Sequence, residues 1–307
     1  MKKNRVTLVE VGMRDGLQNE KSVVTLQNKI ELTKRLVEAG VIRLELGAFV
    51  RPDRVPQMKD SAELLRHFYG VKSYSGIHES VLIPNEKGME LASEFPIKEI
   101  ALFTAATESF NQKNINCSIE ESFKRFEAIV KIAKKKKIKI RGYLSTCFGC
   151  PYEGSVDMNK VVQLVGRLLK LGCYEVSVGD TIGVAVPTQI DSLVKKLKAK
   201  KIPLSKIAGH FHDTRGTALI NIFHAYQLGV NTFDSSIGGL GGCPFAPGAA
   251  GNVSTEDVVY MFEKMGVKTG LNLNRLIETN HWLSQVMQKK LPSKVGLAGD
   301  FLVKEET

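Results

Sequence analysis

Amphipathic helices, single glycines and short apolar strands follow one another repeatedly along this chain. One such unit has a helical pattern that ends at Gly40 and continues into the apolar segment 41–46. Two more have helical patterns that end at Gly172 and Gly229, and each is followed by strand-like residues. A Gly just past a helix takes the left-handed conformation that ends it. Strands that alternate with helices return through crossovers, so the pattern predicts a parallel sheet.

About eight strands fit this pattern, with helices between them. The helix expected after Ser118 is well marked, because Ser118 and Glu121 have the spacing of a capping box. Eight strand–helix units in about 250 residues are what a closed TIM (β/α)8 barrel requires, and a doubly wound open sheet is the alternative. The strands are expected to begin near Val6, Val41, Tyr74, Glu99, Lys137, Tyr174, Ile207 and Val230.

Two further helical patterns, near Glu256–Lys264 and Leu273–Val286, are expected to close the chain. No linker composition separates them from the barrel. We therefore expect residues 1–307 to form one domain, with the closing C-terminal helices from about residue 254.

The bulk composition is that of a globular protein. Of 307 residues, 43% are hydrophobic and 24% are charged, and no apolar run approaches the roughly 20 residues that span a bilayer. The first apolar stretch is too short for a signal peptide, so we expect a cytoplasmic protein without membrane partners. The five cysteines are an odd number scattered over a large chain, which favours reduced thiols over disulfides.

The net charge of +11 favours anionic partners, either nucleic acid or a phosphate-rich cofactor such as coenzyme A. The densest basic run is Lys134–Lys137. Its simplest interpretation is the solvated, cation-rich last turn of a helix, with acyl-CoA steering or nucleic-acid binding as alternatives.

Polar residues stand at the C-terminal ends of several predicted strands, which is where barrels place their chemistry. Arg14 and Asp15 directly follow strand 1 and are either a structural ion pair in a turn or a metal ligand beside a charge-stabilising Arg. Glu45 stands within the otherwise apolar strand 2. A buried charge needs a partner, so Glu45 belongs either to the site or to a structural pair with Arg14.

The segment Gly209-His210-Phe211-His212-Asp213 carries two histidines at spacing two. Strand periodicity places both imidazoles on one face, which favours a metal site over two separate core histidines. Asp213 and Thr214 are expected to cap the next helix rather than to bind metal.

A glycine-rich stretch, 238–252, follows strand 8 and contains Cys243 and Asn252. Cys243 suits a proton donor or nucleophile, although a phosphate-cradling loop with an incidental Cys is the alternative. Asn252 offers an amide oxygen to a metal. The combined set of Asp15, His210, His212 and Asn252 suits Mg²⁺ or Mn²⁺ better than Zn²⁺.

Two other motifs carry weaker signals. The pair Cys147 and Cys150 forms a lone CxxC, for which we expect a structural use. Asp180 stands at the end of strand 6, where a site role and a helix-cap role are equally compatible with the sequence.

Several of these motifs together resemble the 3-hydroxy-3-methylglutaryl-CoA lyase family over nearly the whole chain. The wider superfamily contains barrel metallolyases and acetyl-CoA condensing synthases. The matching segments are 11–12, 14–21, 55–58, 113–118, 149–154, 179–183, 210–214 and 239–244.

The resemblance implies cleavage of 3-hydroxy-3-methylglutaryl-CoA to acetyl-CoA and acetoacetate. Carried over by position, Asp15, His210, His212 and Asn252 would bind one Mg²⁺ or Mn²⁺ ion. Arg14, Glu45, Cys243 and Asp180 would serve catalysis, Arg14 and Gln18 would contact the substrate, and Asp15 or His210 would act as base. We expect no organic cofactor beyond the substrate's CoA, and a homodimer.

Other activities are weighed against this one. The segment Arg51-Pro52-Asp53-Arg54 departs from the family sequence expected there, so a related 3-hydroxy-3-alkylglutaryl-CoA is an alternative substrate. A synthase that condenses acetyl-CoA with a 2-oxo acid is the second alternative. A nucleic-acid binder is disfavoured, because no aromatic residues interleave the lysine run.

Overall fold

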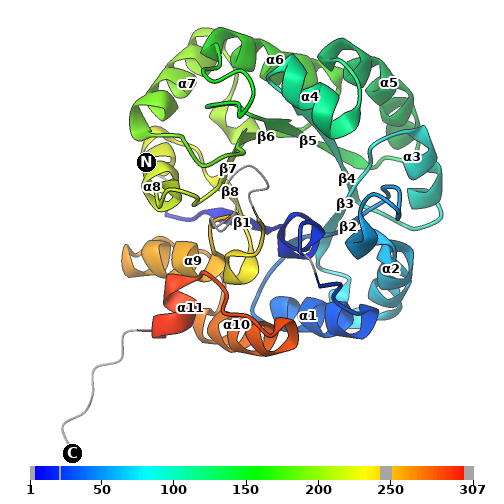
Figure 1. Cartoon of the computed structure of the whole chain (residues 1–307), viewed down its shortest axis with the longest axis vertical. Coiled ribbons are helices and arrows are strands. Elements are labelled where there is room, and N and C mark those ends of the chain that lie inside the picture. The colour runs from blue at the N-terminus through cyan, green and yellow to red at the C-terminus, as the bar shows by residue number, and fades with distance from the viewer. Residues whose placement is uncertain (1–3, 21, 243–250, 301–307) are drawn as a thin grey trace, which may run out of the picture.

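Eight parallel strands close into a barrel, as the sequence predicts (Figure 1). The computed structural model describes residues 4–20, 22–242 and 251–300. Each strand pairs with its neighbour in the chain, and β8 pairs back with β1, so the sheet has no edge. The strands are β1 (Thr7–Glu10), β2 (Arg43–Ala48), β3 (His78–Leu82), β4 (Glu99–Ala105), β5 (Lys139–Ser145), β6 (Glu175–Asp180), β7 (Ile207–Phe211) and β8 (Thr232–Ser235).

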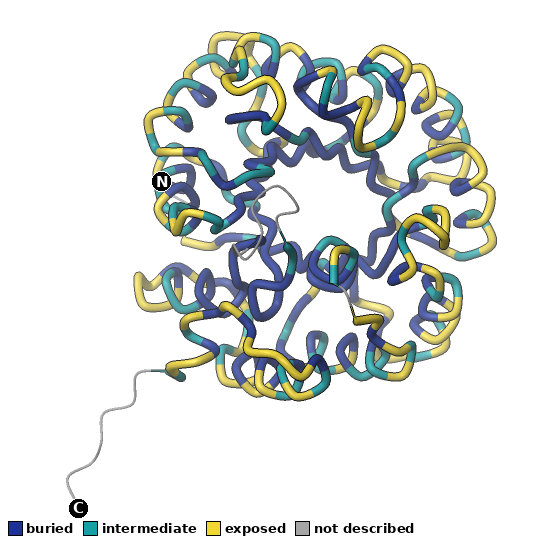
Figure 2. The backbone as a smooth tube through the Cα atoms, in the orientation of Figure 1, coloured by how far each residue is buried: buried dark blue, intermediate teal, exposed yellow. Residues whose placement is uncertain are grey.

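Helices surround the barrel and bury one side against it (Figure 2). Their inward faces are buried and their outward faces exposed, which is the arrangement expected of amphipathic helices on a barrel. The helices are α1 (Leu26–Glu38), α2 (Ser61–Gly70), α3 (Glu86–Ala92), α4 (Glu108–Ile115), α5 (Ile119–Lys135), α6 (Met158–Leu171), α7 (Pro187–Ala199), α8 (Ala218–Leu228), α9 (Thr255–Lys264), α10 (Leu273–Met287) and α11 (Lys294–Ala298).

Seven strands begin within two residues of their predicted starts. The exception is β3, which begins at His78 rather than near Tyr74. Residues Lys72–Tyr74 instead form a 3-10 turn, η3, in which the Tyr74 side chain is buried. An apolar aromatic residue in a turn is therefore what misplaced this boundary.

Local signals in the sequence set several helix ends. The Ser118 hydroxyl accepts a hydrogen bond from the Glu121 amide at 3.1 Å, and the Glu121 carboxylate accepts one from the Ser118 amide at 2.7 Å. The predicted capping box therefore begins α5. Helices α6 and α8 have Gly172 and Gly229 as their C-caps, with φ angles of 132° and 109°.

The closing helices pack on one another and on the barrel's first helix. Helix α10 lies against α1 and α9, and α11 lies against α9 and α10 (Figure 1). The buried carboxylate of Glu256 on α9 accepts hydrogen bonds from the Gly238 amide and from Asn280 on α10. These helices thus fix the segment that leaves β8. No helix in the described part of the chain is long and apolar enough to cross a membrane.

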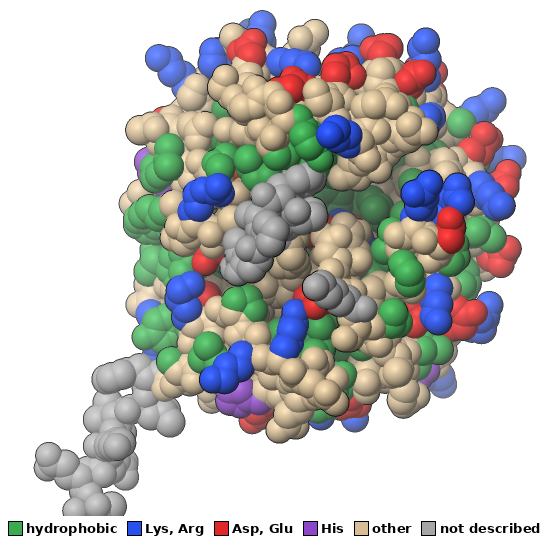
Figure 3. Space-filling model, viewed as in Figure 1, with side chains coloured by type: hydrophobic (Ala, Val, Ile, Leu, Met, Phe, Trp, Pro, Cys, Tyr) green, Lys and Arg blue, Asp and Glu red, His purple; other side chains and the backbone are tan. Residues whose placement is uncertain are grey.

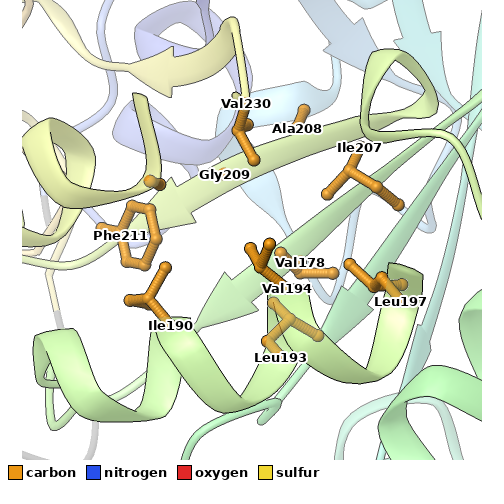
Figure 4. A pocket seen from close by; sticks show the side chains of 11 residues that line it. Val178, Ile190, Leu193, Val194, Leu197, Ile207, Ala208, Gly209, Phe211 and Val230 are labelled. Carbon is orange, nitrogen blue, oxygen red and sulfur yellow. The ribbon is translucent and has the colours of Figure 1, made fainter. Parts of the chain in front are cut away.

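Apolar side chains fill the space between α7 and the barrel. Between α7 and strands β6 and β7 the structure leaves an apolar void of only about 10 Å³ (Figure 4). Val178, Ile190, Val194, Ile207 and Phe211 are among its lining residues. A void of this size holds at most one water molecule, so it is a packing defect and no ligand site.

Candidate active site

Arg14 and Asp15 lie on a single π-helical turn, η1 (Gly12–Gly16), directly after β1. The buried carboxylate of Glu10 holds this turn, because it accepts hydrogen bonds from the Gly12 amide at 2.8 Å and from the Ile237 amide at 2.9 Å. A side chain at position 12 would meet Glu10 Oε1 at 2.5 Å. The glycine therefore allows the turn to sit against the β8 loop, and isolated π turns are frequent at functional sites.

Three predicted metal ligands come together at the ends of β1 and β7. One ligand atom each from Asp15, His210 and His212 lie within 4.8 Å of one another. The two imidazole centroids are 5.2 Å apart, as the two-residue spacing on one strand face predicts. Nδ1 of His212 is buried and makes no hydrogen bond.

The pKa shifts of this group suit metal ligation. Burial alone would raise the pKa of Asp15, but Arg14 and the two histidines outweigh it and lower the value to about 2. Burial, assisted by His210, lowers the pKa of His212 to about 4. At neutral pH the carboxylate is therefore ionised and the His212 imidazole is neutral, which are the forms that bind metals.

Asn252 reaches the same place through backbone pairing. A β-bridge joins it to His212, and its side chain contacts Asp15. The contact is made by the amide nitrogen, which donates to Asp15 Oδ2 at 2.8 Å and to the Leu240 carbonyl at 3.1 Å. The amide oxygen, which is the atom predicted as a metal ligand, would face Asp15 only if the side-chain amide of Asn252 rotated so that its oxygen and nitrogen exchanged places.

Arg14 and Glu45 form a buried pair within the site. Nη2 of Arg14 lies 2.8 Å from Glu45 Oε2, and Nη1 lies 2.6 Å from Asp15 Oδ1. Of the two alternatives for Glu45, the structure shows the ion pair with Arg14, and its role in the site stays a prediction. Burial raises the pKa of Glu45, although Arg14 opposes this shift.

Three buried residues that the sequence did not single out complete a ring around the barrel interior. Tyr143 donates to Glu45 at 3.2 Å, and Arg141 donates to Tyr143 at 2.8 Å and to Asp234 at 2.7 Å. Asp234 in turn lies 3.2 Å from His210 Nδ1. They lie on β5 and β8, whose sequences are mixed polar and apolar, so no signal like that of Glu45 marks them.

The Asp180 side chain holds the loop that follows β6 through hydrogen bonds to its backbone. Its two carboxylate oxygens accept hydrogen bonds from the Val184 and Ala185 amides at 2.9 and 3.0 Å. These contacts hold the loop before α7 and are no helix cap, because the N-cap of α7 is Val186, so the site role of Asp180 stays a prediction. Asp213 has the capping role predicted for it, because its carboxylate accepts a hydrogen bond from the first amide of α8, at Ala218.

The other predicted features occupy varied positions. Gln18 lines the cavity beside Arg14. Cys243 lies outside the described residues. Cys147 and Cys150 are buried free thiols, as the structural interpretation of the CxxC motif predicts. The run Lys134–Lys137 is exposed at the end of α5, which confirms its simplest interpretation.

A cavity of about 850 Å³ opens above these groups, within the size range of ligand sites. Arg14, Asp15, His210 and His212 lie among its lining residues, and so do apolar side chains such as Phe103. A hollow at this face, with Lys and Arg side chains around it, is visible in Figure 3. The basic residues that line the cavity beyond Arg14 are Arg51, Arg54, Lys113 and Arg125.

Comparison with known proteins agrees with this geometry. The HMGL-like family model matches residues 5–283. A mitochondrial hydroxymethylglutaryl-CoA lyase of Pongo abelii is 49% identical over 96% of this chain and 89% of its own length.

Two solved structures are also similar. An HMG-CoA lyase of Bacillus subtilis is 42% identical with a TM-score of 0.93, over 97% of this chain and 98% of its own. An HMG-CoA lyase of Acinetobacter baumannii, solved with coenzyme A and 3-methylmalate, is 36% identical with a TM-score of 0.92, over 99% and 98% of the two chains. With a family model and a close relative that both span most of its length, the chain belongs to the HMGL-like family.

Proposed function

We propose that this protein is a hydroxymethylglutaryl-CoA lyase, a carbon–carbon lyase that cleaves 3-hydroxy-3-methylglutaryl-CoA to acetyl-CoA and acetoacetate. The observation that carries the proposal is the convergence of Asp15, His210 and His212 beside Arg14, at the bottom of a cavity with basic residues in its lining. Close relatives with this activity in their names support it.

The residues present fit a divalent cation. Asp15, His210 and His212 supply one oxygen and two nitrogen donors at suitable mutual distances, and the buried, unpartnered Nδ1 of His212 is a donor atom without another use. No thiolate is among them, which favours Mg²⁺ or Mn²⁺. Asn252 would join through its oxygen if its amide turned over. When bound, the ion would polarise the substrate's 3-hydroxyl and lower its pKa.

The chain's own residues would carry the proton transfers and hold the charge. A base removes the proton of the 3-hydroxyl, the bond between C2 and C3 breaks, and acetoacetate leaves a thioester enolate behind. Of the two candidate bases, Asp15 has a pKa of about 2 and would accept this proton poorly, whereas His210 would act as base only with an Nε2 lone pair that is not bound to the metal.

Arg14 is placed to stabilise the enolate. Its guanidinium is buried, and Glu45 and Asp15 hold it from two sides, so no reorganisation is needed when negative charge develops. We propose that Cys243 then donates a proton to the enolate carbon, which yields acetyl-CoA. This role comes from the family resemblance alone.

The basic residues of the cavity suit the phosphates of coenzyme A. Arg51, Arg54, Lys113 and Arg125 all line the cavity, and the Arg54 and Arg51 side chains are exposed. Arg51 already pairs with Asp53 at 2.6 Å, which reduces its free charge. Exposed cations at a cavity mouth raise the local concentration of anionic ligands, so they support an acyl-CoA substrate.

A substrate panel tests the proposal against its alternatives. The purified protein with Mg²⁺ or Mn²⁺ is offered 3-hydroxy-3-methylglutaryl-CoA, its 3-ethyl and 3-propyl analogues, and acetyl-CoA with several 2-oxo acids. We expect acetoacetate from the methyl compound at the highest kcat/KM. Faster cleavage of a longer analogue would identify a different acyl preference, and thiol release with a 2-oxo acid would identify a synthase.

Four finer assignments are part of the proposal. We propose a homodimer, a cytoplasmic location, a single folding domain and Mg²⁺ or Mn²⁺ as the working metal. Light scattering measures the oligomeric state, and cell fractionation measures the location. A single cooperative calorimetric transition would indicate one folding domain, and metal analysis of the freshly purified protein identifies the working metal.

A further inference from the structure

The two ring nitrogens of His210 face different carboxylates. Nδ1 lies 3.2 Å from Asp234 Oδ2, and Nε2 lies 3.9 Å from Asp15 Oδ2. Of the two nitrogens, Nε2 is the one that faces a predicted ligand, Asp15. The orientation and the tautomer of this ring therefore decide whether a lone pair points into the site.

Hydrogen bonds from neighbouring side chains fix the carboxylate of Asp234. It is 1% exposed, and its Oδ1 accepts a hydrogen bond from Arg141 Nη2 at 2.7 Å. Its Oδ2 accepts one from the Ser177 hydroxyl at 2.7 Å, on the same oxygen that faces His210. Neighbours on β5, β6 and β7 thus fix both oxygens of a carboxylate that projects from β8.

Arg141 is equally constrained. Its Nε donates to Glu175 at 2.8 Å, its Nη1 donates to Tyr143 at 2.8 Å, and its Nη2 donates to Asp234. The side chain is fully buried. Such a forked cation, bonded in three directions, can hold an anion in one place more firmly than a lysine could.

We propose that Asp234 and Arg141 are positioning residues of this site: Asp234 keeps the proton of His210 on Nδ1, and Arg141 keeps Asp234 in place. An ionised carboxylate can only accept hydrogen bonds, so the nitrogen that faces it must be the one that carries the proton. Nε2 then retains its lone pair toward Asp15. This inference rests on the proposed function, because His210 uses that lone pair either as ligand or as base.

Binding of Mn²⁺, followed by electron paramagnetic resonance of the free ion, tests the proposal without any turnover. In Asp234→Asn an amide NH₂ group can face His210 Nδ1 in place of an acceptor oxygen. Nδ1 can then be the unprotonated nitrogen, so the tautomer of the His210 ring is no longer fixed. We expect Mn²⁺ to bind about 10- to 100-fold more weakly, the usual effect of removing such a partner. Asp234→Glu keeps the carboxylate and should recover part of the affinity.

Glu79→Gln is the matched control. Glu79 is also a fully buried carboxylate on a barrel strand, and it accepts hydrogen bonds from Tyr69 and from the Lys98 amide, away from the site. Its loss should lower thermal stability but leave Mn²⁺ affinity unchanged. Asp234→Asn that binds Mn²⁺ as tightly as the wild type would overturn the positioning role.

A second measurement decides the matter if Asp234→Asn does not fold. Wild-type protein labelled with ¹⁵N-histidine, free of metal and at alkaline pH, should show the His210 proton on Nδ1 in two-bond ¹⁵N–¹H correlation spectra. A proton on Nε2 would overturn the inference. Wild-type protein that shows the Nδ1 tautomer but binds no Mn²⁺ would instead refute the proposed function and leave the positioning geometry standing.

Discussion

Arg14 Nη2 lies 2.8 Å from Glu45 Oε2, and both side chains are at most 5% exposed. This ion pair joins the π-helical turn after β1 to the middle of β2. Because a second nitrogen of the same guanidinium binds Asp15, the pair fixes the cation next to the predicted metal ligands. In the proposed reaction, Arg14 would stabilise the enolate from this position.

Arg14→Gln should lower kcat by on the order of 10³-fold or more, because the developing charge loses its preorganised partner. The substitution also leaves Glu45 buried without its cation, which costs about 3–5 kcal/mol of stability. Steady-state kinetics with a melting curve for each variant measures both effects. The control is Arg275→Gln, since Arg275 is 51% exposed and pairs with the surface residue Glu38. A near-normal kcat in Arg14→Gln would refute the charge-stabilising role.

Gly12→Ala should destabilise the fold and disturb the site, because the new methyl group would meet Glu10 Oε1 at 2.5 Å. Overpacking of this kind costs roughly 1–3 kcal/mol. Gly70→Ala at the end of α2 is the matched control, since a methyl group there meets nothing within 4 Å. Urea unfolding compares the two, and equal stabilities would show that the π turn tolerates a side chain.

Glu256 should make stability depend on pH. Burial raises its pKa from 4.5 to about 7, against hydrogen bonds from Gly238, Asn280 and Ser254 that lower it. Because the pKa of Glu256 is higher in the folded state than in the unfolded state, its contribution to the free energy of unfolding is fully present below pH 4.5. That contribution is lost as the pH rises through 7. Relative to Glu256→Gln, the wild type should therefore lose up to about 1.4 kcal/mol of unfolding free energy per pH unit in this window.

Urea titrations of the two proteins at several pH values measure this difference. The comparison with Glu256→Gln cancels the contributions of other groups, such as His212, whose pKa falls to about 4 on folding. A difference that is flat across the window, or that grows in favour of the wild type as pH rises, would contradict the raised pKa.

Arg54→Glu should raise KM for the acyl-CoA by roughly 3- to 10-fold and leave kcat nearly unchanged, because its charge acts on the phosphates rather than on the reacting atoms. The effect should shrink at high salt. Lys135→Glu makes the same change of charge on the exposed end of α5 and should leave KM unaltered. An equal rise in both variants would point to net charge alone.

Local patterns in the sequence were sufficient for most of the fold. The helix predicted to end at Gly229 is α8, whose C-cap is that residue, and strand periodicity correctly placed His210 and His212 on one face. These features depend on neighbours a few residues away. The predicted start of β3 was wrong, because the 3-10 turn at Lys72–Tyr74 has no comparably local signature in the sequence.

The rest of the site depends on closure of the barrel. Asp234 and Arg141 are 93 residues apart and meet only because β5 and β8 face one another across the interior. The sequence places each charge on a predicted strand, but it does not show which charges pair. The side of the Asn252 amide that faces Asp15 is likewise set by the Leu240 carbonyl, a tertiary contact.

Acetoacetate release from 3-hydroxy-3-methylglutaryl-CoA, measured before and after metal removal, tests the central claim most directly. We predict that EDTA-treated protein keeps its melting temperature but makes no acetoacetate, and that Mg²⁺ or Mn²⁺ restores the rate. Asp15→Asn should stay at least about 100-fold slower with added metal, because it lacks the ionised ligand. Undiminished turnover in metal-free protein, or a wild-type rate in Asp15→Asn, would contradict a metal-dependent lyase built on Asp15, His210 and His212.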